Sequence, residues 1–413
     1  MPRWTLPAAG IAPLIFRDYF ELHWGLVLCA MLFLVVCLIT EQSEARGRFL
    51  AARESWRGLA CVLPLIAFGG LDWFIYHLGG NSSVISKIGA RWFRFGLWTV
   101  FAVLVISWVA RGKMKTFRHW RALVCAWLFL GIAVLVAALW AQMRDSSNQK
   151  IYTSRNFYGV LSVFENRRDE PEGHHFLLLH GRITHGLQFV NPQQARQATT
   201  YYAESSGVGL AVGALPQGPR RIGVVGLGTG SMAVYGRAGD YLRIYEINPE
   251  VKRVAKTRFS YVPDCPGRVE IVLGDARLSM EREPPGQFDL LVLDAFSSDA
   301  IPVHLLTKEA FQLYDRHLKT DGIIAVHISN HYLDLEPVVA NVAKYFRFKS
   351  ALIDFEGNDE EWWLYSSTWI LLTRNQATLE LPPIRSSMTA LKINQSVPLW
   401  TDDFASLLQI LRK

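Results

Sequence analysis

Three acidic residues in the middle of the chain follow successive apolar runs and could hold or activate a ligand. Glu246 ends the first of these runs, Asp275 follows the second, and Asp294 ends the third. If the runs are neighbouring parallel strands, the three carboxylates line one crevice at the carboxyl edge of a sheet. In this order they suit a ribose, an adenine amino group and a reacting centre. Asp275 has a second interpretation as a helix N-cap, which stays open.

Three glycines stand ahead of these acids in one turn. Residues 221–231 read as a β-strand, a turn with Gly226, Gly228 and Gly230, and the start of a helix. Glycine lets the backbone approach a ligand where a Cβ would collide, and Glu246 follows at about 20 residues, as a ribose-binding acid does. The third glycine comes one position earlier than in Gly-x-Gly-x-x-Gly. The spacing therefore favours an S-adenosylmethionine-type nucleoside site over a dinucleotide site.

A second carboxylate follows Asp294 in the same predicted loop. The segment runs Asp-Ala-Phe-Ser-Ser-Asp-Ala-Ile-Pro, so that Asp299 lies five positions further on. Two carboxylates on one loop can face one pocket, bind a cationic amine and accept its proton as it attacks. Alkyl transfer from a sulfonium needs mainly positioning and deprotonation, because the leaving group is already activated. Asp299 could instead only close the loop, and this alternative stays open.

Other candidate residues have a weaker case for a catalytic or binding role. His180 and His185 are expected to face opposite sides of one strand, with no third ligand beside them, so no metal site is predicted. The pair Trp362–Trp363 could line an amine pocket or belong to a core or lid. The pair Asp402–Asp403 could add charge at the mouth of a site or form a solvated turn.

Alternating strand-like and helix-like runs must position these residues. Strands are predicted at 221–226, 241–246, 269–273, 288–294, 322–328, 349–354 and 368–373, and helices near 230–237, 249–258, 306–318 and 334–346. Such alternation favours a parallel sheet with helices on both faces. Ahead of it, three β-like runs at 157–164, 176–180 and 183–190 predict a small antiparallel sheet, and 199–213 reads as a helix.

The apolar residues concentrate at the start of the chain. Half of the 413 residues are hydrophobic, and four apolar runs at 24–40, 58–80, 95–110 and 122–140 each approach the roughly 20 residues that cross a bilayer. The alternative is a large buried helical bundle. The net charge of +7 comes partly from short basic connectors between these runs, which suit anionic lipid headgroups better than nucleic acid. We therefore expect a membrane-embedded region and no nucleic-acid partner.

The expected fold class has three parts. Residues 1–145 are predicted to be an N-terminal α-helical transmembrane segment of about four helices, 146–198 a small antiparallel β-domain, and 199–413 a Rossmann-like α/β domain of the S-adenosylmethionine-type methyltransferase fold. The expected location is the inner (plasma) membrane, as a multi-pass protein. The basic connector at 111–121 would place the last domain outside, whereas a cytosolic nucleoside cofactor favours a cytoplasmic catalytic domain, which we prefer. The five cysteines include no Cys-x-x-Cys, so no disulfide framework is expected.

From about residue 157 to 403 the chain resembles the spermidine synthase (polyamine aminopropyltransferase) family, in particular its membrane-fused members. Several segments carry this resemblance together: His180-Gly-Arg-Ile-Thr-His-Gly-Leu-Gln188, Thr199-Thr-Tyr-Tyr-Ala-Glu-Ser205, Val225-Gly-Leu-Gly-Thr-Gly230, Tyr245-Glu-Ile-Asn-Pro249, Gly274-Asp275, Leu293-Asp-Ala-Phe-Ser-Ser-Asp-Ala-Ile-Pro302 and Leu399-Trp-Thr-Asp-Asp403. The family fold is a small β-domain followed by a Rossmann-like domain.

The resemblance implies a role for each matching residue. Glu246 corresponds to the ribose-binding acid, Asp275 to the acid that contacts adenine, and Asp294 to the base that deprotonates the attacking amine. The remaining matches are Gln188 and Tyr202 as cofactor and substrate contacts, and Asp299 and Glu204 on the side of the amine. Two departures, Tyr202-Ala-Glu204 and the five-residue spacing of the two loop acids, surround the amine and leave its identity open.

The implied reaction moves an aminopropyl group from decarboxylated S-adenosylmethionine to a di- or polyamine and releases methylthioadenosine. Two alternatives stay open: a methyltransferase that uses intact S-adenosylmethionine, and a non-catalytic membrane sensor of polyamine or nucleoside. The expected partners are a small-molecule amine and the lipid bilayer, with a homodimer as one allowed assembly. No metal cofactor is expected.

Overall fold

Two β-sheets carry the part of the chain that the computed structural model describes, which comprises residues 149–181, 183–295, 302–330, 332–389, 391 and 397–412. The chain divides into two units, and all of these residues belong to the unit that contains 148–413. The predicted domain boundaries at 145 and 198 stay predictions.

The smaller sheet is a four-stranded antiparallel meander. Its strands are β1 (Lys150–Asn156), β2 (Gly159–Asn166), β3 (His175–His180) and β4 (Ile183–Phe189), in the order β1-β2-β3-β4. Tight turns join β1 to β2 and β3 to β4; Gly159 and Gly181 have φ values of 129° and 63° there, which suit glycine. The small sheet predicted from the sequence is present, with β1 as an additional strand.

The larger sheet has eight strands and the topology of a Rossmann-like fold. Neighbouring strands follow the order β12-β10-β11-β9-β8-β5-β6-β7, and β9, β8, β5, β6 and β7 are parallel to one another. The strands are β5 (Arg221–Val225), β6 (Tyr241–Glu246), β7 (Arg268–Leu273), β8 (Phe288–Leu293), β9 (Leu318–His327), β10 (Lys349–Phe355), β11 (Ser367–Thr373) and β12 (Met388–Thr389). The predicted Rossmann-like component of the fold is confirmed.

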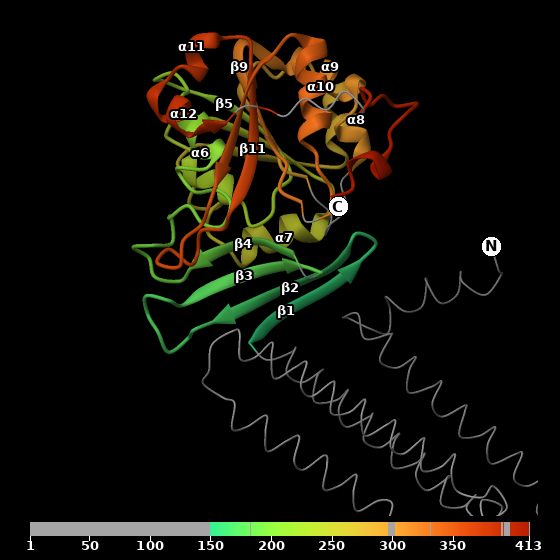
Figure 1. Ribbon diagram of the computed structural model, residues 1–413. Helices are drawn as coiled ribbons and strands as arrows, with labels where there is room; N and C mark the ends of the chain where they lie inside the picture. The colour runs from blue at the N-terminus through green and yellow to red at the C-terminus, as the bar shows by residue number, and fades with distance from the viewer. Residues whose placement is uncertain are drawn as a thin grey trace, which may run out of the picture. The chain divides into compact units, whose positions relative to one another are not determined.

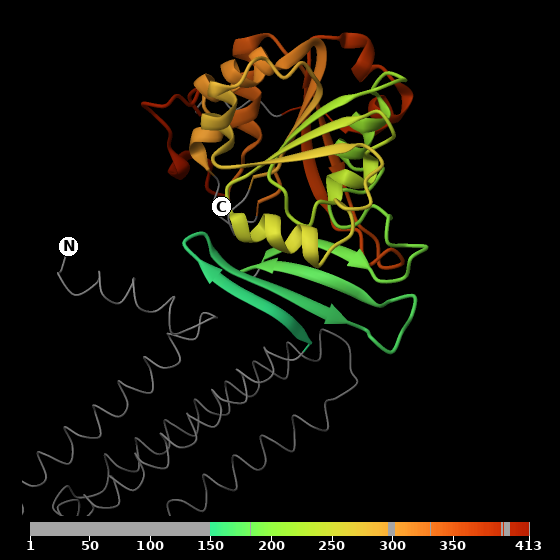
Figure 2. The same cartoon turned by 180° about the vertical axis from the view of Figure 1, so that it is seen from behind.

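Helices cover both faces of this sheet, as Figures 1 and 2 show from opposite sides. On β8, Leu290 and Val292 pack with one hydrophobic cluster, whereas Leu291 and Leu293 pack with the other, as the two-residue period of a strand requires. One face carries α6 (Gly207–Gly213), the 3₁₀ helix η2 (Ser231–Tyr235), α7 (Pro249–Thr257), α11 (Gln376–Leu379) and α12 (Pro382–Ser387). The other carries α8 (Ala276–Arg282), η3 (Val303–Leu305), α9 (Lys308–His317), α10 (Glu336–Phe346) and η4 (Leu407–Ile410).

Polar contacts join the small sheet to the start of α7. The Asn156 side chain donates to the side chain of Asn248 at 2.7 Å, and Tyr152 hydrogen-bonds Glu250. Asn248 is the N-cap of α7, and Pro249 starts the helix, as the Asn-Pro-Glu signature predicts. The small sheet is therefore held beside the carboxyl end of β6, where Glu246 lies.

The structure corrects two predictions about strands and helices. The strands at 349–355 and 367–373 run antiparallel to their neighbours, because the connection between them contains no helix that could return the chain to the same edge. The helix predicted at 199–213 begins only at Gly207, since Ser206 caps it and residues 201–205 form turns.

The transmembrane component of the expected fold class is wrong for the structure as described. Among the described residues, no helix has the length and apolar character needed to span a bilayer. The longest α-helix in this part of the chain is α10, with 11 residues, about half of the length that spanning requires. The four apolar runs of the prediction fall outside the described residues. The cellular location is a separate prediction and stays one.

Candidate active site

The glycine turn after β5 brings three segments of backbone together. Gly226, Gly228 and Gly230 have φ values of +100°, +54° and +88°. A Cβ on Gly226 would lie 2.2 Å from the carbonyl oxygen of Asp294, and one on Gly228 would lie 2.7 Å from that of His185. Neither backbone oxygen can move aside, so glycine is required where these strands and the turn converge. The turn thus seats Asp294 and His185 at one place.

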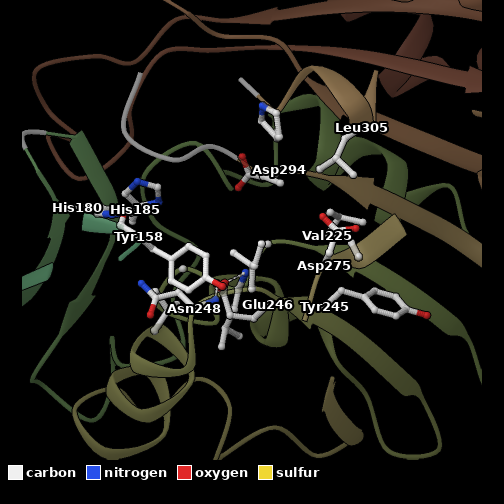
Figure 3. A pocket seen from close by; sticks show the side chains of 18 of the residues that line it. Tyr158, His180, His185, Val225, Tyr245, Glu246, Asn248, Asp275, Asp294 and Leu305 are labelled. Carbon is white, nitrogen blue, oxygen red and sulfur yellow. Dashed lines mark hydrogen bonds between the residues drawn. The ribbon is translucent and has the colours of Figure 1, made fainter. Parts of the chain in front are cut away.

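A cavity of about 180 Å³ opens beside this turn, and we call it the glycine cavity. The small sheet supplies one wall through Tyr158, His180 and His185, and the carboxyl ends of the parallel strands supply the other (Figure 3). The wall from the large sheet includes Val225–Gly228, Tyr245–Asn248, Gly274–Ala276 and Asp294–Ala295. The crevice predicted from the strand ends is therefore present, with Glu246, Asp275 and Asp294 all in its lining.

Glu246 is buried at the end of β6 and faces the glycine turn. Its carboxylate accepts the backbone N–H of Leu227 at 3.0 Å and that of Asn248 at 2.8 Å. Burial raises its pKa to about 7, although these backbone N–H groups favour the charged form. A carboxylate has about four acceptor positions, so two remain for a pair of ligand hydroxyls.

The family resemblance implies a nucleoside at this site, and its affinity should then depend on the ionisation of Glu246. A pKa of about 7 leaves the group mostly protonated at pH 6 and mostly ionised at pH 8, and only the carboxylate accepts two hydroxyl donors. We expect methylthioadenosine to bind up to about tenfold more tightly at pH 8 than at pH 6. Titration calorimetry of the wild type and Glu246→Gln measures this; a pH dependence that is equally steep in the variant would contradict it.

The same raised pKa has the opposite effect on folding. The folded state holds the Glu246 proton more strongly than the unfolded chain does, so this group's contribution to stability falls as the pH rises from 4.5 to about 7. Glu246→Gln removes this loss, because the amide stays neutral throughout that range.

Asp275 is both a helix cap and a lining residue. It caps α8 by accepting the N–H of Leu278 at 3.0 Å, and its other oxygen lies 2.8 Å from Nε2 of His304. The N-cap interpretation left open by the sequence is confirmed. Because Asp275 also lines the glycine cavity, capping and ligand contact do not exclude each other.

Asp294 lies at the end of β8 with both carboxylate oxygens engaged. The Tyr202 hydroxyl donates to Oδ2 at 2.5 Å, and Nδ1 of His327 lies 2.7 Å from Oδ1. Burial, followed by the charge of Asp294, raises the pKa of Tyr202 well above 10, so this hydroxyl keeps its proton and remains a donor. The prediction that Tyr202 and Asp294 belong to one site agrees with this contact.

His327 was not anticipated from the sequence, although a signal for it existed. It ends β9, the parallel neighbour of β8, so it lies at the same carboxyl edge as Asp294. The rule that selected the three acids would have selected it as well. Its Nε2 lies 2.8 Å from Oγ of Ser329, which in turn accepts the N–H of Thr368 at 2.8 Å.

A second cavity, of about 680 Å³, meets the first at Asp294, and we call it the hairpin cavity. Residues 354–357 and 365–368, from the ends of β10 and β11 and their connection, form one side of it. Tyr201, His327 and Ser329 are also in its lining, as are Asp354 and Glu356. Asp294 and His185 line both cavities.

Tyr202 and Gly230 adjoin the site without lining either cavity as described, and three further predicted site residues are also absent from both linings. Gln188 is buried in β4, where its amide binds Ala195 and Ser260, and Glu204 is exposed to solvent. Asp299 lies outside the described residues. The roles assigned to these three by family resemblance stay predictions.

His180 and His185 lie together, which contradicts the expectation that they face opposite sides of one strand. They belong to the two strands of the β3–β4 hairpin, with ring centroids 5.4 Å apart. Burial lowers both pKa values, that of His185 to about 4, so both rings are neutral at pH 7. Among the described residues, no group of three possible metal ligands occurs.

The tryptophan and aspartate pairs from the C-terminal part do not line either cavity, although Asp402 lines an adjoining cavity together with Asp275 and His304 of the glycine cavity. Trp362 packs against His175 in a tilted arrangement with ring centroids 4.9 Å apart, and the guanidinium of Arg167 lies over its ring. Asp402 pairs with Arg277 at 2.5 Å. This ion pair lowers the pKa of Asp402 to about 2. Asp402 thus holds the C-terminal segment against α8.

Comparison with known proteins finds two curated relatives that match part of the chain. No family model matches the chain. A polyamine aminopropyltransferase from Vibrio vulnificus is 28% identical over 184 residues, which cover 43% of this chain and 58% of that protein. An N-terminal histidine N-methyltransferase from Emericella nidulans is 34% identical over 110 residues, 25% of this chain and 19% of that protein. The chain thus spans less than two thirds of the length of either curated relative.

Solved structures give a weaker likeness. The spermidine synthase from Thermotoga maritima is 16% identical with a TM-score of 0.39, over 60% of this chain and 82% of that one. A probable spermidine synthase from Corynebacterium glutamicum is 20% identical with a TM-score of 0.43, over 54% and 79%. Both TM-scores are below 0.5, so the fold assignment depends on the strand order above. By sequence, the chain is similar to a polyamine aminopropyltransferase, and the resemblance to this family inferred from its motifs is confirmed, whereas the likeness to its membrane-fused members stays a prediction.

Proposed function

We propose that this chain transfers an aminopropyl group from decarboxylated S-adenosylmethionine to an amine. The glycine cavity would hold the nucleoside, with Glu246 on the ribose hydroxyls and Asp275 on the adenine amino group. The apolar side chains of Val225, Ile247 and Leu305 in the same lining suit the faces of a purine. The hairpin cavity would admit the amine.

The observation that carries this proposal is the position of Asp294 in both linings. An acceptor in the hairpin cavity and a sulfonium in the glycine cavity would meet at this carboxylate. The Tyr202 and His327 contacts fix its orientation, and a fixed carboxylate can hold the acceptor nitrogen in line with the carbon that it attacks once its proton is lost. Family resemblance makes Asp294 the base of this step.

The charges of the glycine cavity favour the decarboxylated cosubstrate over the intact one. Its described lining contains the carboxyl groups of Glu246, Asp275 and Asp294, the neutral rings of His180 and His185, and no Lys or Arg. A third histidine, His304, is engaged by Asp275 at 2.8 Å. Carboxylates attract the aminopropyl ammonium and repel the methionine carboxylate of intact S-adenosylmethionine. A methyltransferase site has to provide donors for that carboxylate, so aminopropyl transfer fits these residues better.

Product analysis tests the proposal. Full-length protein is incubated with decarboxylated or intact S-adenosylmethionine and a panel of di- and polyamines, and products are identified by mass. Methylthioadenosine together with an amine lengthened by one aminopropyl group is the expected result. Formation of S-adenosylhomocysteine would identify a methyltransferase instead, and tight nucleoside binding without turnover would favour the sensor alternative.

The acids of the hairpin cavity should govern affinity for the amine. Asp354 lies at the end of β10, where it accepts the Thr368 hydroxyl at 2.9 Å, and Glu356 follows it in the same lining. We expect Asp354→Asn to raise KM for the amine about three- to tenfold at unchanged kcat, because a partly solvated charge pair is worth only about 1 kcal/mol. Asp315→Asn, at an exposed ion pair with Arg374, is the matched control and should leave KM unchanged.

A further inference from the structure

We propose that His327, and not Asp294, receives the proton that the acceptor amine loses, with Ser329 as the link between amine and imidazole. This inference deepens the proposed function and depends on it. It places the base one strand away from the acid that family resemblance selects. Asp294 then keeps its charge throughout the reaction.

The hydrogen bonds around His327 define a chain of three groups. Oδ1 of Asp294 lies 2.7 Å from Nδ1, and Oγ of Ser329 lies 2.8 Å from Nε2. A carboxylate oxygen can only accept, so Nδ1 carries a hydrogen, and in the neutral ring Nε2 is the free base. The Ser329 hydroxyl accepts the N–H of Thr368 and can therefore direct its own hydrogen at Nε2. This order of groups is the one by which carboxylate, imidazole and hydroxyl act together in hydrolases.

The same two partners, Asp294 and Ser329, can hydrogen-bond His327 in its neutral and in its protonated form. In the imidazolium, Nε2–H donates to Oγ of Ser329, whose hydrogen is then free to point into the hairpin cavity. The Asp294 carboxylate faces the new positive charge. The ring lies between two aromatic side chains, with centroids 4.7 Å from Tyr201 and 4.5 Å from Trp369 and interplanar angles of 27° and 16°. Aromatic faces stabilise a cation placed over them.

Asp294 is poorly suited to hold the proton itself. Both of its oxygens already receive a hydrogen bond, from Tyr202 and from His327, so a proton added to either oxygen would have to displace one of these donors. His185 also lines both cavities, but its Nε2 is buried with no hydrogen-bond partner among the described residues, and burial keeps its ring neutral. Tyr201 stacks on His327 and also interacts with Asp294. The other ionisable side chains in the described lining of the hairpin cavity are Asp354, Glu356, Tyr365 and Arg412.

The step balances in atoms and charge. The acceptor ammonium donates a hydrogen bond to the remaining lone pair of Ser329 Oγ. As its N–H bond breaks, that proton joins Ser329 while the hydroxyl hydrogen passes to Nε2 of His327. The freed nitrogen lone pair forms the bond to the aminopropyl carbon, and the C–S electron pair leaves with sulfur. A sulfonium and an ammonium thus become a neutral thioether, a secondary ammonium and an imidazolium.

Two substitutions at His327 distinguish a role in proton transfer from a role in only holding Asp294 in place. In His327→Asn the amide nitrogen can occupy the place of Nδ1 and keep the hydrogen bond to Asp294, whereas in His327→Gln it can occupy that of Nε2 and keep the bond to Ser329. Neither amide can take up a proton. We expect both variants to lose about 100-fold in kcat with little change in KM. We also expect kcat to rise with pH in the wild type and to be independent of pH in both variants.

Thermal stability and methylthioadenosine affinity, measured on the full-length proteins, show that the variants are folded with an intact nucleoside site. An Asn variant with kcat within about threefold of the wild type and an unchanged pH profile would overturn the relay and leave His327 a support for Asp294. If the wild type makes no lengthened amine, the proposed function fails first and this inference fails with it. An active wild type with an active Asn variant removes the relay alone.

Discussion

Asp294→Asn is expected to lower kcat by about 1,000-fold while methylthioadenosine still binds within about threefold of the wild-type affinity. The charge at this position is required whether Asp294 takes the amine proton or stabilises an imidazolium that does. An asparagine has one oxygen and one NH₂ group, so it cannot accept from both Tyr202 and His327 as the carboxylate does. The Tyr202 hydroxyl or the His327 N–H then loses its acceptor, and the side chains where the two cavities adjoin are no longer held in place.

Single-turnover measurement with saturating cosubstrate isolates this effect, because it is independent of product release. Asp289→Asn is the matched control: Asp289 lies on the same strand but binds the Arg221 N–H and Lys319 at its opposite end. We expect kcat of this control variant to stay within about twofold of the wild-type value. A kcat for Asp294→Asn within tenfold of the wild type would remove Asp294 from the chemistry.

Gly226→Ala is expected to damage both stability and turnover. A Cβ would stand 2.2 Å from the Asp294 carbonyl oxygen, and φ is +100°. The parallel ladder holds both sides of this contact, through Gly226 N–H to Tyr245 at 2.9 Å and Asp294 N–H to Val225 at 2.9 Å. We expect a loss of about 2–4 kcal/mol in unfolding free energy, from backbone strain and overpacking together. Displacement of Asp294 by a fraction of an ångström should cost about 100-fold in kcat/KM as well.

Gly213→Ala provides the comparison for this substitution. Gly213 ends α6, and a Cβ there meets nothing within 4 Å. It should leave turnover unchanged and stabilise slightly, because alanine favours a helix. Thermal unfolding and kcat/KM of the two variants are measured side by side. Wild-type behaviour of Gly226→Ala would show that the turn can open without cost and would contradict the close approach.

The sheet and the acidic crevice were within reach of the sequence because both follow from local patterns. Apolar runs of strand length alternate with amphipathic helices, and the carboxyl ends of parallel strands meet at one edge. That geometry turns three acids separated by tens of residues into one lining, as Glu246, Asp275 and Asp294 show.

What the sequence could not supply depends on long-range pairing. The position of β11 between β9 and β10 decides that Trp369 stacks on His327 and that Thr368 binds Ser329, and no local pattern encodes strand order. Gln188 looks like a ligand residue within its motif, yet Ser260, 72 positions away, engages its amide from both sides. The apolar N-terminal runs suggested spanning helices by composition alone, and the described helices do not include one.

Central strands form one wall of the hairpin cavity and a loop forms much of the other. The reaction and the choice of amine can therefore change independently. Asp294 and His327 are fixed at the ends of β8 and β9 in the middle of the sheet, whereas much of the opposite wall is the connection between β10 and β11. Loops accept changes in length and sequence that central strands do not. Exchange of residues 356–366 alone should therefore alter the accepted amine and leave the reaction intact, so that relatives could diversify in substrate without rebuilding their chemistry.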